Sequence, residues 1–389
     1  MFKKAIILTI TLLVVFTATL AILLQVLSPG FSKGSQSSTF LQESQIKNDF
    51  DNLIRLRYNQ YLQKYDKNYK QTFEYLNGLN TFKNNIAIID KYNQNQKSFV
   101  LKANRFSDLS VEEFKRLYTG RPQTSQNIIN SSSSEQDQTV DQDNTNNSTN
   151  KSGKLNTKII ESRDILKLPE SFDWRQKNVI TSVKDQGGCG GCYCFTMIAA
   201  LESALLIKNK EKYQGIDLSE QQIIDCSVNY GAFGCNGGFE FQAGYLMTNT
   251  RVAFEKLYPY LGRNKECNKT LSNDSSVPPI KQTLYKTGRH SSIMKMTLMN
   301  QPYAIGISSS SEVFRFYSSG VITSYDCSQN IDHSVLLIGW GKTNYNLEYW
   351  IIKNQWGTSW GENGYVKVMI NNDGLSPCQV GFDLTIPVV

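Results

Sequence analysis

The chain has 389 residues, 40% of them hydrophobic and 11% aromatic, and this composition excludes a globally disordered protein. At about 150 residues per domain, the length predicts two or three folded units. Most of the formal net charge of +7 lies in residues 1–166, which hold 21 basic and 15 acidic residues, whereas residues 167–389 hold 20 and 19. A nucleic-acid-binding domain carries a basic patch on its folded part. Because the C-terminal half is nearly neutral, we expect no nucleic-acid partner.

An apolar segment, residues 5–27, follows residues 1–4, which include Lys3 and Lys4. Its 23 residues exceed the roughly 7–15 residues of a signal-peptide core and reach the roughly 20 that cross a bilayer. The segment therefore predicts either a transmembrane signal-anchor, with residues 1–4 as a cytosolic stub, or a long cleavable signal peptide. In both cases we expect the rest of the chain to enter the endomembrane system, for a lysosome or vacuole or for secretion.

Two different segments follow before the C-terminal half. Residues 45–118 show apolar residues at helical spacing and predict a small, mostly helical unit. Residues 119–164 are rich in Ser, Asn and Gln and predict a low-complexity linker, since they hold too little apolar surface to fold. Four glycosylation sequons fall in this linker and predict a glycoprotein: Asn130, Asn146, Asn147 and Asn150.

Residues 165–389 read as one compact domain. A broad apolar stripe predicts a helix over 192–208. Later segments of apolar and β-branched residues, separated by Gly, Asn and Asp, predict strands over 303–307, 335–340, 349–353 and 365–370. Helices first and strands later indicate an α+β domain whose halves face each other.

The cysteines point to a reactive thiol. All eight lie between Cys189 and Cys378, and Cys192 stands where a glycine-rich segment gives way to the predicted helix. The unpaired backbone N–H groups and the dipole of a helix N-terminus favour a thiolate. We therefore predict Cys192 as a nucleophile, approached by substrate over the neighbouring glycines.

Only two histidines exist, so any histidine chemistry uses His290 or His333. His290 lies in a polar turn, whereas His333 begins an apolar strand and is the better partner for a thiol. Asn354 follows a later strand, and its amide is suited to hold an imidazole in one tautomer, the third role of a catalytic triad. Trp356 is expected to shield this contact from water.

Several short motifs surround these candidates in a fixed order. Residues 189–193 read Cys-Gly-Gly-Cys-Tyr and match the signature Cys-Gly-(Ser/Ala)-Cys-(Trp/Tyr) except at Gly191. The other motifs are residues 168–175, 218–222, 234–238, 258–260 and 360–365. From about Phe50 to the C-terminus, apart from the linker, the chain resembles a papain-like, cathepsin-L-type cysteine protease zymogen. The resemblance implies an α+β fold of two lobes, a helical left lobe and a β-barrel-like right lobe with the active-site cleft between them, preceded by a helical propeptide.

The resemblance also implies a role for each site residue. Cys192 is the nucleophile, His333 the general base and acid, Asn354 the residue that orients His333, and Gln186 a donor to the oxyanion. Further residues are expected to contact substrate: Gly190, Gly237, Gly238, Phe239, Glu240, Asp332, Trp356 and Asp383. The implied disulfides are Cys189–Cys235, Cys226–Cys267 and Cys327–Cys378, which leave Cys192 and Cys194 free. We interpret Cys194 as a buried packing residue.

Two departures from the family pattern bear on specificity. Glu240 and Asp383 map to the wall and floor of the pocket that binds the second residue before the cleaved bond, where most relatives carry apolar or small residues. Two carboxylates there favour Arg or Lys beside hydrophobic residues. The alternative is that Glu240 points to solvent and Asp383 pairs locally.

The expected activity is therefore that of a cysteine endopeptidase, a hydrolase that acts on peptide and protein substrates through an acyl-enzyme. We expect the propeptide at 45–118 to inhibit the enzyme from within the same chain, the mature domain to be a monomer, and no metal or cofactor to take part.

Three other functions compete with this one. Cys189 and Cys192 form a C-x-x-C motif, typical of a thiol–disulfide oxidoreductase, but the βαβ context of that motif is missing. A metal site built on Cys189, Cys192 and Cys194 lacks further ligands at suitable spacing. A catalytically silent homologue usually loses the nucleophile or the base, and both are present here.

Overall fold

The computed structural model describes residues 36–122, 168–268, 277–287, 290–327 and 329–389. The apolar segment 5–27, the four sequons and most of the predicted linker lie outside these residues. No helix within the described ranges is both long and apolar enough to span a bilayer. The chain forms two compact units, Met1–Tyr69 and Lys70–Val389. This division cuts the predicted propeptide unit, because the part after residue 69 folds together with the C-terminal domain.

The first unit contains one long described helix, α2 (Gln36–Lys64). Aromatic residues three or four positions apart on a helix face each other. Accordingly, the rings of Tyr58 and Tyr61 stack at 5.9 Å, and the rings of Tyr61 and Tyr65 lie 5.0 Å apart. The helical periodicity read from the sequence is confirmed in this segment.

The second unit begins with helix α3 (Thr72–Asn95), strand β1 (Phe99–Leu101) and helix α4 (Val111–Tyr118). Helix α4 starts at a capping box, in which Ser110 and Glu113 satisfy each other's backbone N–H groups. Strand β1 was not predicted, and it pairs antiparallel with β5 (Tyr317–Ile322) at the edge of the main sheet. Three residues are too few to produce a readable alternation of apolar and polar positions.

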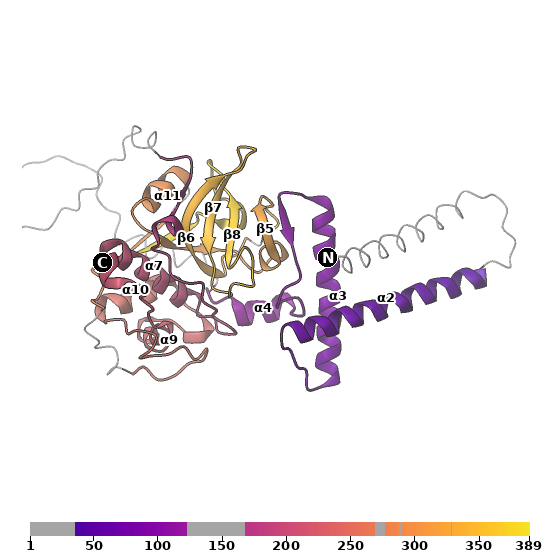
Figure 1. Cartoon of the computed structure of the whole chain (residues 1–389). Helices are drawn as coiled ribbons and strands as arrows, with labels where there is room; N and C mark the ends of the chain where they lie inside the picture. Colours follow the sequence, from indigo (N-terminus) through magenta and orange to yellow (C-terminus); the bar gives the residue numbers. More distant parts are fainter. Residues whose placement is uncertain (1–35, 123–167, 269–276, 288–289, 328) are drawn as a thin grey trace, which may run out of the picture. The chain divides into compact units, whose positions relative to one another are not determined.

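The helical lobe is built around α7 (Cys192–Lys208), whose bounds equal those predicted. Every residue of α7 from Cys192 to Leu206 is buried, as expected for a helix that is apolar on all sides. Three shorter helices join it: α8 (Lys210–Tyr213), α9 (Glu220–Cys226) and α10 (Glu240–Asn249). Figure 1 shows α7, α9 and α10 together on one side of this unit and the strands on the other.

The second lobe is a mixed sheet in the order β1-β5-β8-β7-β6-β4-β9-β3, with β2 paired to β6. The remaining strands are β2 (Phe172–Asp173), β3 (Gln282–Thr287), β4 (Tyr303–Ile307), β6 (His333–Lys342), β7 (Glu348–Lys353), β8 (Tyr365–Met369) and β9 (Asp383–Val388). Helices α11 (Ser291–Leu298) and α12 (Glu312–Arg315) connect them. Strand β6 begins at His333, two residues before the predicted start, and pairs it with Ile307 of β4.

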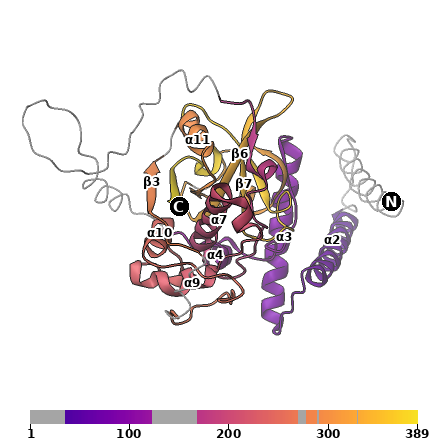
Figure 2. The ribbon, with the colours of Figure 1, turned by 60° about the vertical axis from the view of Figure 1, so that its left-hand side comes forward.

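The two lobes share an apolar core. Ala199 and Ala200 of α7 pack against Leu336 and Ile338 of β6 and Ile351 of β7. Figure 2 shows α7 lying over β6 and β7. This contact places the N-terminus of α7, with Cys192, beside the first residues of β6. The predicted α+β architecture of two lobes with an N-terminal helical propeptide is confirmed.

Candidate active site

Cys192 is the first residue of α7 and is completely buried. Ser334, the residue after His333, lies close enough to the Cys192 sulfur to favour the thiolate in part. Burial, reinforced by the negative charge of Glu240, raises the pKa of the Cys192 thiol to about 12. In this form of the protein the group is therefore a neutral thiol at physiological pH.

His333 lies at the start of β6 and is held on two sides. Its Nε2 atom is 2.9 Å from Oδ1 of Asn354, and its ring stacks on that of Trp356 with centroids 4.7 Å apart. The Nδ1 atom has no hydrogen-bond partner within the described part of the chain. Burial lowers the pKa of His333 to about 4, against the opposing effect of the bond to Asn354. The imidazole is thus neutral here, with one nitrogen oriented and the other available.

Gln186 lies in the loop before α7 and is fully buried. Its side-chain amide donates to the carbonyl of Cys189 at 2.8 Å and to the carbonyl of Tyr118, at the end of α4, at 3.3 Å. The preceding residue, Asp185, forms an ion pair with Arg105 of the propeptide region. The loop predicted to bind an oxyanion is therefore covered by the segment that precedes the linker.

Residues 119–122, predicted as the beginning of the linker, instead lie against the loops around Cys192. The N–H groups of Gly120 and Arg121 both donate to the carbonyl of Asp332, at 3.1 and 3.0 Å, and Gly238 donates to the carbonyl of Gly120 at 2.8 Å. A Cβ atom on Gly120 would lie 1.9 Å from the carbonyl oxygen of Gly190. Backbone pairing with Asp332 and Gly238 thus holds the first residues after α4 in place, although this segment has little apolar surface.

The predicted glycines fit a close approach of backbone to backbone. At Gly237, which has a φ of 114°, a Cβ atom would lie 2.1 Å from the carbonyl oxygen of Gly120. At Gly190 it would lie 2.9 Å from the carbonyl oxygen of Thr119. Side chains at Gly237 and Gly190 would therefore clash with the backbone of residues 119–120.

The side chain of Arg121 enters a pocket formed by Glu240 and Asp383. Its guanidinium forms an ion pair with Asp383, and its Nε atom lies 3.4 Å from Oε2 of Glu240. The Cζ atom is 5.5 Å from the ring centroid of Phe239. The side chains of all three charged residues are at most 4% exposed. The alternative in which Glu240 points to solvent is therefore wrong.

Neighbouring groups hold the two pocket carboxylates in place. The hydroxyl of Ser334 donates to Glu240, and both the backbone N–H of Gly306 and the hydroxyl of Tyr285 donate to Asp383, at 3.0 and 3.3 Å. Burial opposes the charge of Arg121, yet Asp383 and Glu240 together raise its pKa. Burial also raises the pKa of Glu240, although Arg121 acts in the opposite direction. The pocket thus holds one cationic side chain, that of Arg121, between two buried carboxylates.

Aromatic residues cover the other side of His333. The rings of Phe106 and Phe114, both from the propeptide region, meet the ring of Trp356 edge-on at 5.3 and 5.2 Å. Trp356 in turn contacts Phe314 of α12 and Trp360. The expectation that Trp356 shields the His333–Asn354 contact agrees with its complete burial.

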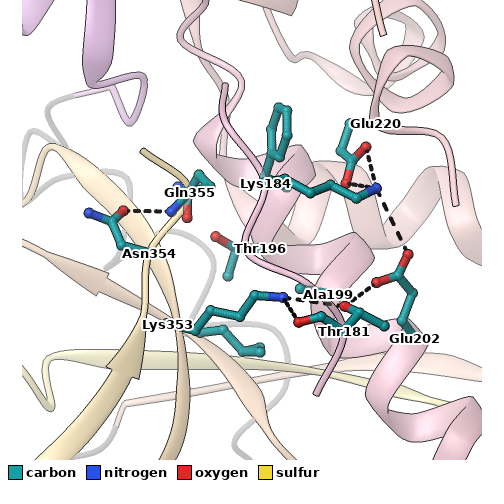
Figure 3. Close-up of a pocket in the computed structure, with 11 residues that line it drawn as sticks. Thr181, Lys184, Thr196, Ala199, Glu202, Glu220, Lys353, Asn354 and Gln355 are labelled. Atoms are coloured by element: carbon teal, nitrogen blue, oxygen red, sulfur yellow. Dashed lines mark hydrogen bonds and ion pairs between the residues drawn. The ribbon is translucent and has the colours of Figure 1, made fainter. Parts of the chain in front are cut away.

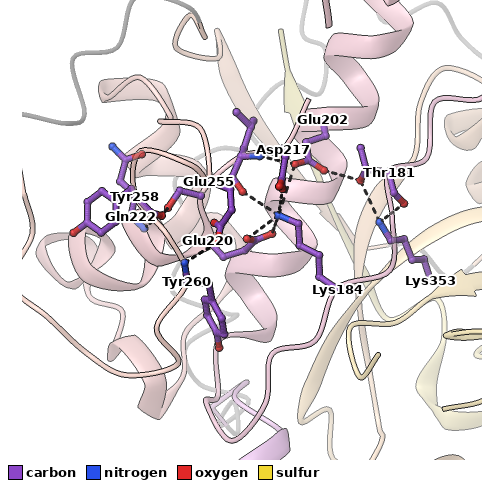
Figure 4. Close-up of polar contacts among 12 residues, drawn as sticks. Thr181, Lys184, Glu202, Asp217, Glu220, Gln222, Glu255, Tyr258, Tyr260 and Lys353 are labelled. Carbon is purple, nitrogen blue, oxygen red and sulfur yellow. Dashed lines mark hydrogen bonds and ion pairs between the residues drawn. The ribbon is translucent and has the colours of Figure 1, made fainter. Parts of the chain in front are cut away.

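Behind the cleft lies a small cavity that the sequence did not reveal (Figure 3). It is lined from the helical lobe by Lys184, Glu202 and Glu220, and from the end of β7 by Lys353 and Asn354. Figure 4 shows the charged side chains of this cluster. The Nζ atom of Lys184 lies 2.8 Å from Glu220 and 2.7 Å from Asp217.

In the cluster of Lys184, Glu202, Glu220 and Lys353, each charged group shifts the pKa of its neighbours. Burial raises the pKa of Glu220 to about 8 and also raises that of Glu202, with Lys184 opposing both shifts. Lys353 donates to the carbonyl of Thr181 at 2.9 Å, and burial lowers the pKa of its ammonium to about 8. Because Lys353 precedes Asn354, the cluster anchors the strand end that presents the amide to His333.

The cysteines pair as Cys189–Cys235, Cys226–Cys267 and Cys327–Cys378, the pairs that the family resemblance implies. Cys192 and Cys194 are free and buried. Since Cys189 is bonded to Cys235, it forms no redox pair with Cys192, and the oxidoreductase alternative loses its motif. Burial raises the pKa of Cys194, which agrees with a packing role.

Comparison with protein families gives two matches. The papain family cysteine protease model matches residues 168–388, and the cathepsin propeptide inhibitor domain (I29) model matches residues 58–114. The first match covers more than half of the chain. The chain therefore belongs to the papain family of cysteine proteases, and it carries the propeptide inhibitor domain of a zymogen.

Individual relatives agree with this assignment. The chain is 32% identical over 358 residues to a senescence-specific cysteine protease, SAG12 of Arabidopsis thaliana, covering 90% of this chain and 96% of that one. It is 32% identical over 314 residues to cysteine proteinase COT44 of Brassica napus, covering 79% and 87%. A stem bromelain precursor superposes with a TM-score of 0.69 at 28% identity, over 86% of this chain and 99% of that one. Procathepsin L 3 of Tenebrio molitor gives 0.65 at 25% identity, over 87% and 99%.

Proposed function

We propose that this protein is the precursor of a cysteine endopeptidase that cleaves peptides through Cys192, His333 and Asn354. The observation that carries the proposal is the arrangement of His333, whose Nε2 atom is fixed by Asn354 while its Nδ1 atom is unpaired. The base is thus oriented by a third group and keeps one nitrogen for a proton, as nucleophilic catalysis requires. Cys192 is the expected nucleophile because it begins α7 and lies near Ser334, the residue that follows His333 in the chain.

The reaction proceeds in two halves. The Cys192 sulfur passes its proton to His333 and attacks the peptide carbonyl, and the resulting oxyanion is bound by the side-chain amide of Gln186 and the backbone N–H of Cys192. One such preorganised donor is worth about 3 kcal/mol. The C–N bond breaks as His333 protonates the departing amine. His333 then removes a proton from water, which hydrolyses the thioester and restores the thiol.

The propeptide is the intramolecular inhibitor of this site. Along the chain, Tyr118 contacts Gln186, Gly120 pairs with Gly238, and Arg121 fills the acidic pocket. A substrate places the second residue before the cleaved bond in that pocket and continues past Cys192, so its direction is opposite to that of the propeptide. The reversed direction is the reason why the segment covers the cleft and is not cleaved there.

A basic residue at the second position before the cleaved bond is the preferred substrate feature. Arg121 supports this preference, because its guanidinium binds the two buried carboxylates, Glu240 and Asp383, that a substrate arginine would meet. The ring of Phe239 lies beside the Arg121 side chain and offers an apolar surface. Hydrophobic residues are therefore the second choice at this position.

Two experiments test this function. A thiol-alkylating epoxide should label the mature enzyme and the Cys194→Ala variant, which removes the other free thiol, but not the Cys192→Ala variant. Labelling that persists in Cys192→Ala would refute the nucleophile. Among reporter peptides, an Arg-Arg substrate should be cleaved at least as well as Phe-Arg, and an enzyme restricted to Leu or Phe at that position would refute the basic preference.

The cellular route is part of the proposal. Three disulfides form and persist in oxidising compartments. Together with the apolar segment 5–27, which acts as signal peptide or anchor, they support synthesis into the endomembrane system. N-terminal sequencing of the mature enzyme after membrane fractionation distinguishes a cleaved leader from a retained one.

A further inference from the structure

Arg315 is a fully buried cation at the end of α12. Its position relative to the site follows from two ring contacts. Phe314, the preceding residue, lies 5.8 Å from Trp356, and Trp356 stacks on His333. Because the propeptide is reversed relative to a substrate, its residues before Tyr118 lie on the side where a substrate continues after the cleaved bond, and two of them, Leu109 and Phe114, contact Arg315.

The guanidinium of Arg315 is held by neutral acceptors that all belong to the propeptide region. Its Nη1 atom donates to the carbonyl of Leu109 at 3.3 Å, and its Nη2 atom donates to Oδ1 of Asn85 at 3.2 Å. The Nε atom has no hydrogen-bond partner, and no carboxylate forms an ion pair with Arg315 in the described ranges. The aromatic ring of Phe114 covers it at 5.5 Å.

The main chain of Arg315, in contrast, is also fixed by the mature domain. Its carbonyl accepts from Trp360 at 3.2 Å, in addition to Asn104 of the propeptide region, and its Cζ atom lies 4.5 Å from the ring of Phe316. Burial lowers the pKa of the guanidinium to about 10, with Glu312 and Glu112 in partial opposition. Removal of the propeptide thus takes away both side-chain acceptors and the Phe114 cover, while the position of the residue is kept.

We propose that Arg315 is a specificity residue of the mature enzyme that binds a carboxylate downstream of the cleaved bond. The preferred source is an Asp or Glu side chain at about the third residue after that bond. An arginine without a carboxylate partner binds one in a charge-assisted, often bidentate hydrogen bond. This inference rests on the proposed function, since it needs a cleft in which peptides are cleaved.

Amidated, internally quenched peptides with Arg at the second position before the bond provide the test. Two of these peptides are identical except for the third residue after the cleaved bond, which is Glu in one and Gln in the other. An additional peptide has no Glu and ends at that third residue with a free, non-amidated carboxylate. We expect the wild-type mature enzyme to cleave the Glu peptide with a kcat/KM about three to ten times that of the Gln peptide. The preference for Glu over Gln should vanish in Arg315→Gln and partly remain in Arg315→Lys.

Equal rates for Glu and Gln in the wild type, or a preference that persists in Arg315→Gln, would overturn the proposal. A preference for the free terminal carboxylate over Glu would overturn the assignment to a side chain. If Arg315→Gln yields no mature enzyme, the wild-type preference for Glu over Gln should still decrease as the salt concentration rises to about 1 M, because salt weakens the attraction between the two charges. Failure to cleave any of the peptides would instead refute the proposed function.

Discussion

Replacement of Arg121 by Ala tests how the propeptide keeps the cleft closed. The side chain forms an ion pair with Asp383 and lies 3.4 Å from Glu240, and the side chains of all three residues are at most 4% exposed. Removal of one partner from a buried pair costs about 3–5 kcal/mol, because the other charge remains buried. Because Glu240 can take up a proton and so relieve part of this cost, the closed form of the Arg121→Ala precursor should lose about 3 kcal/mol of stability relative to the open form. The open form of the intact precursor should therefore become roughly 100 times more populated.

The assay is the hydrolysis of a reporter peptide by the intact precursor at neutral pH, with gel electrophoresis to show that the chain stays uncleaved. Arg116→Ala is the matched control, because Arg116 is an exposed arginine on α4 of the same propeptide. Arg121→Lys should retain most of the inhibition. If the intact Arg121→Ala precursor hydrolyses the reporter peptide no faster than the Arg116→Ala precursor, the ion pair does not hold the cleft closed.

Three further results are expected. The preference for Arg over Phe at the second residue before the cleaved bond should weaken as the pH falls. Burial raises the pKa of Glu240, so the pocket loses a negative charge when this carboxylate is protonated. A ratio of the kcat/KM values for the Arg and Phe peptides that is constant from pH 4 to about 7 would contradict this. Gly120→Ala should produce a leaky precursor, since its Cβ would lie 1.9 Å from Gly190, whereas Gly188→Ala, with its nearest contact at 3.7 Å, should not. Lys184→Met should destabilise the mature domain by about 3 kcal/mol, and lower its Tm by about 6 °C or more, because Glu202 and Glu220 lose their cation. The exposed Lys208→Met is the control in differential scanning calorimetry, and equal Tm values for the two variants would show that the cluster contributes nothing.

The sequence predicted the parts of this fold that have strong local patterns. Helix α7 carries a broad apolar stripe and starts after glycines, so its bounds were predicted as observed. Strand β4 was also predicted with its observed bounds. Strands β3 and β9 were missed, because they pair with each other although they are about 100 residues apart in the sequence. No short turn connects them, so the sequence shows no hairpin pattern.

The site shows the same division. Cys192, His333, Asn354 and Gln186 were identified by their motifs, and the structure brings His333 and Asn354 into hydrogen-bonding contact. Glu240 and Asp383 were placed in one pocket by position in the family pattern, and they lie in one pocket here. The occupant of that pocket was not foreseen, because Arg121 follows the last predicted helix and no local pattern distinguishes it from the linker.

The buried Lys184 cluster and Arg315 were missed for a related reason. Charged residues are usually exposed, so a sequence alone assigns them to the surface. Glu202 and Glu220, the partners of Lys184, are buried where the helical lobe meets the end of β7, and Arg315 is buried by the propeptide. Only the tertiary structure reveals that the charged groups at each of these two places are enclosed by the fold.

We propose that Cys192 and His333, which are neutral in the precursor, become a thiolate and an imidazolium once the propeptide leaves. The most direct measurement is the rate of Cys192 alkylation by iodoacetamide as a function of pH, followed by mass spectrometry in the intact precursor and in the mature enzyme. The mature enzyme should react already in mildly acidic solution, whereas in the precursor burial holds the pKa of the thiol at about 12 and the rate should stay negligible up to pH values well above neutral. Identical profiles for the two forms, with reactivity appearing only near the ordinary thiol pKa, would contradict the account.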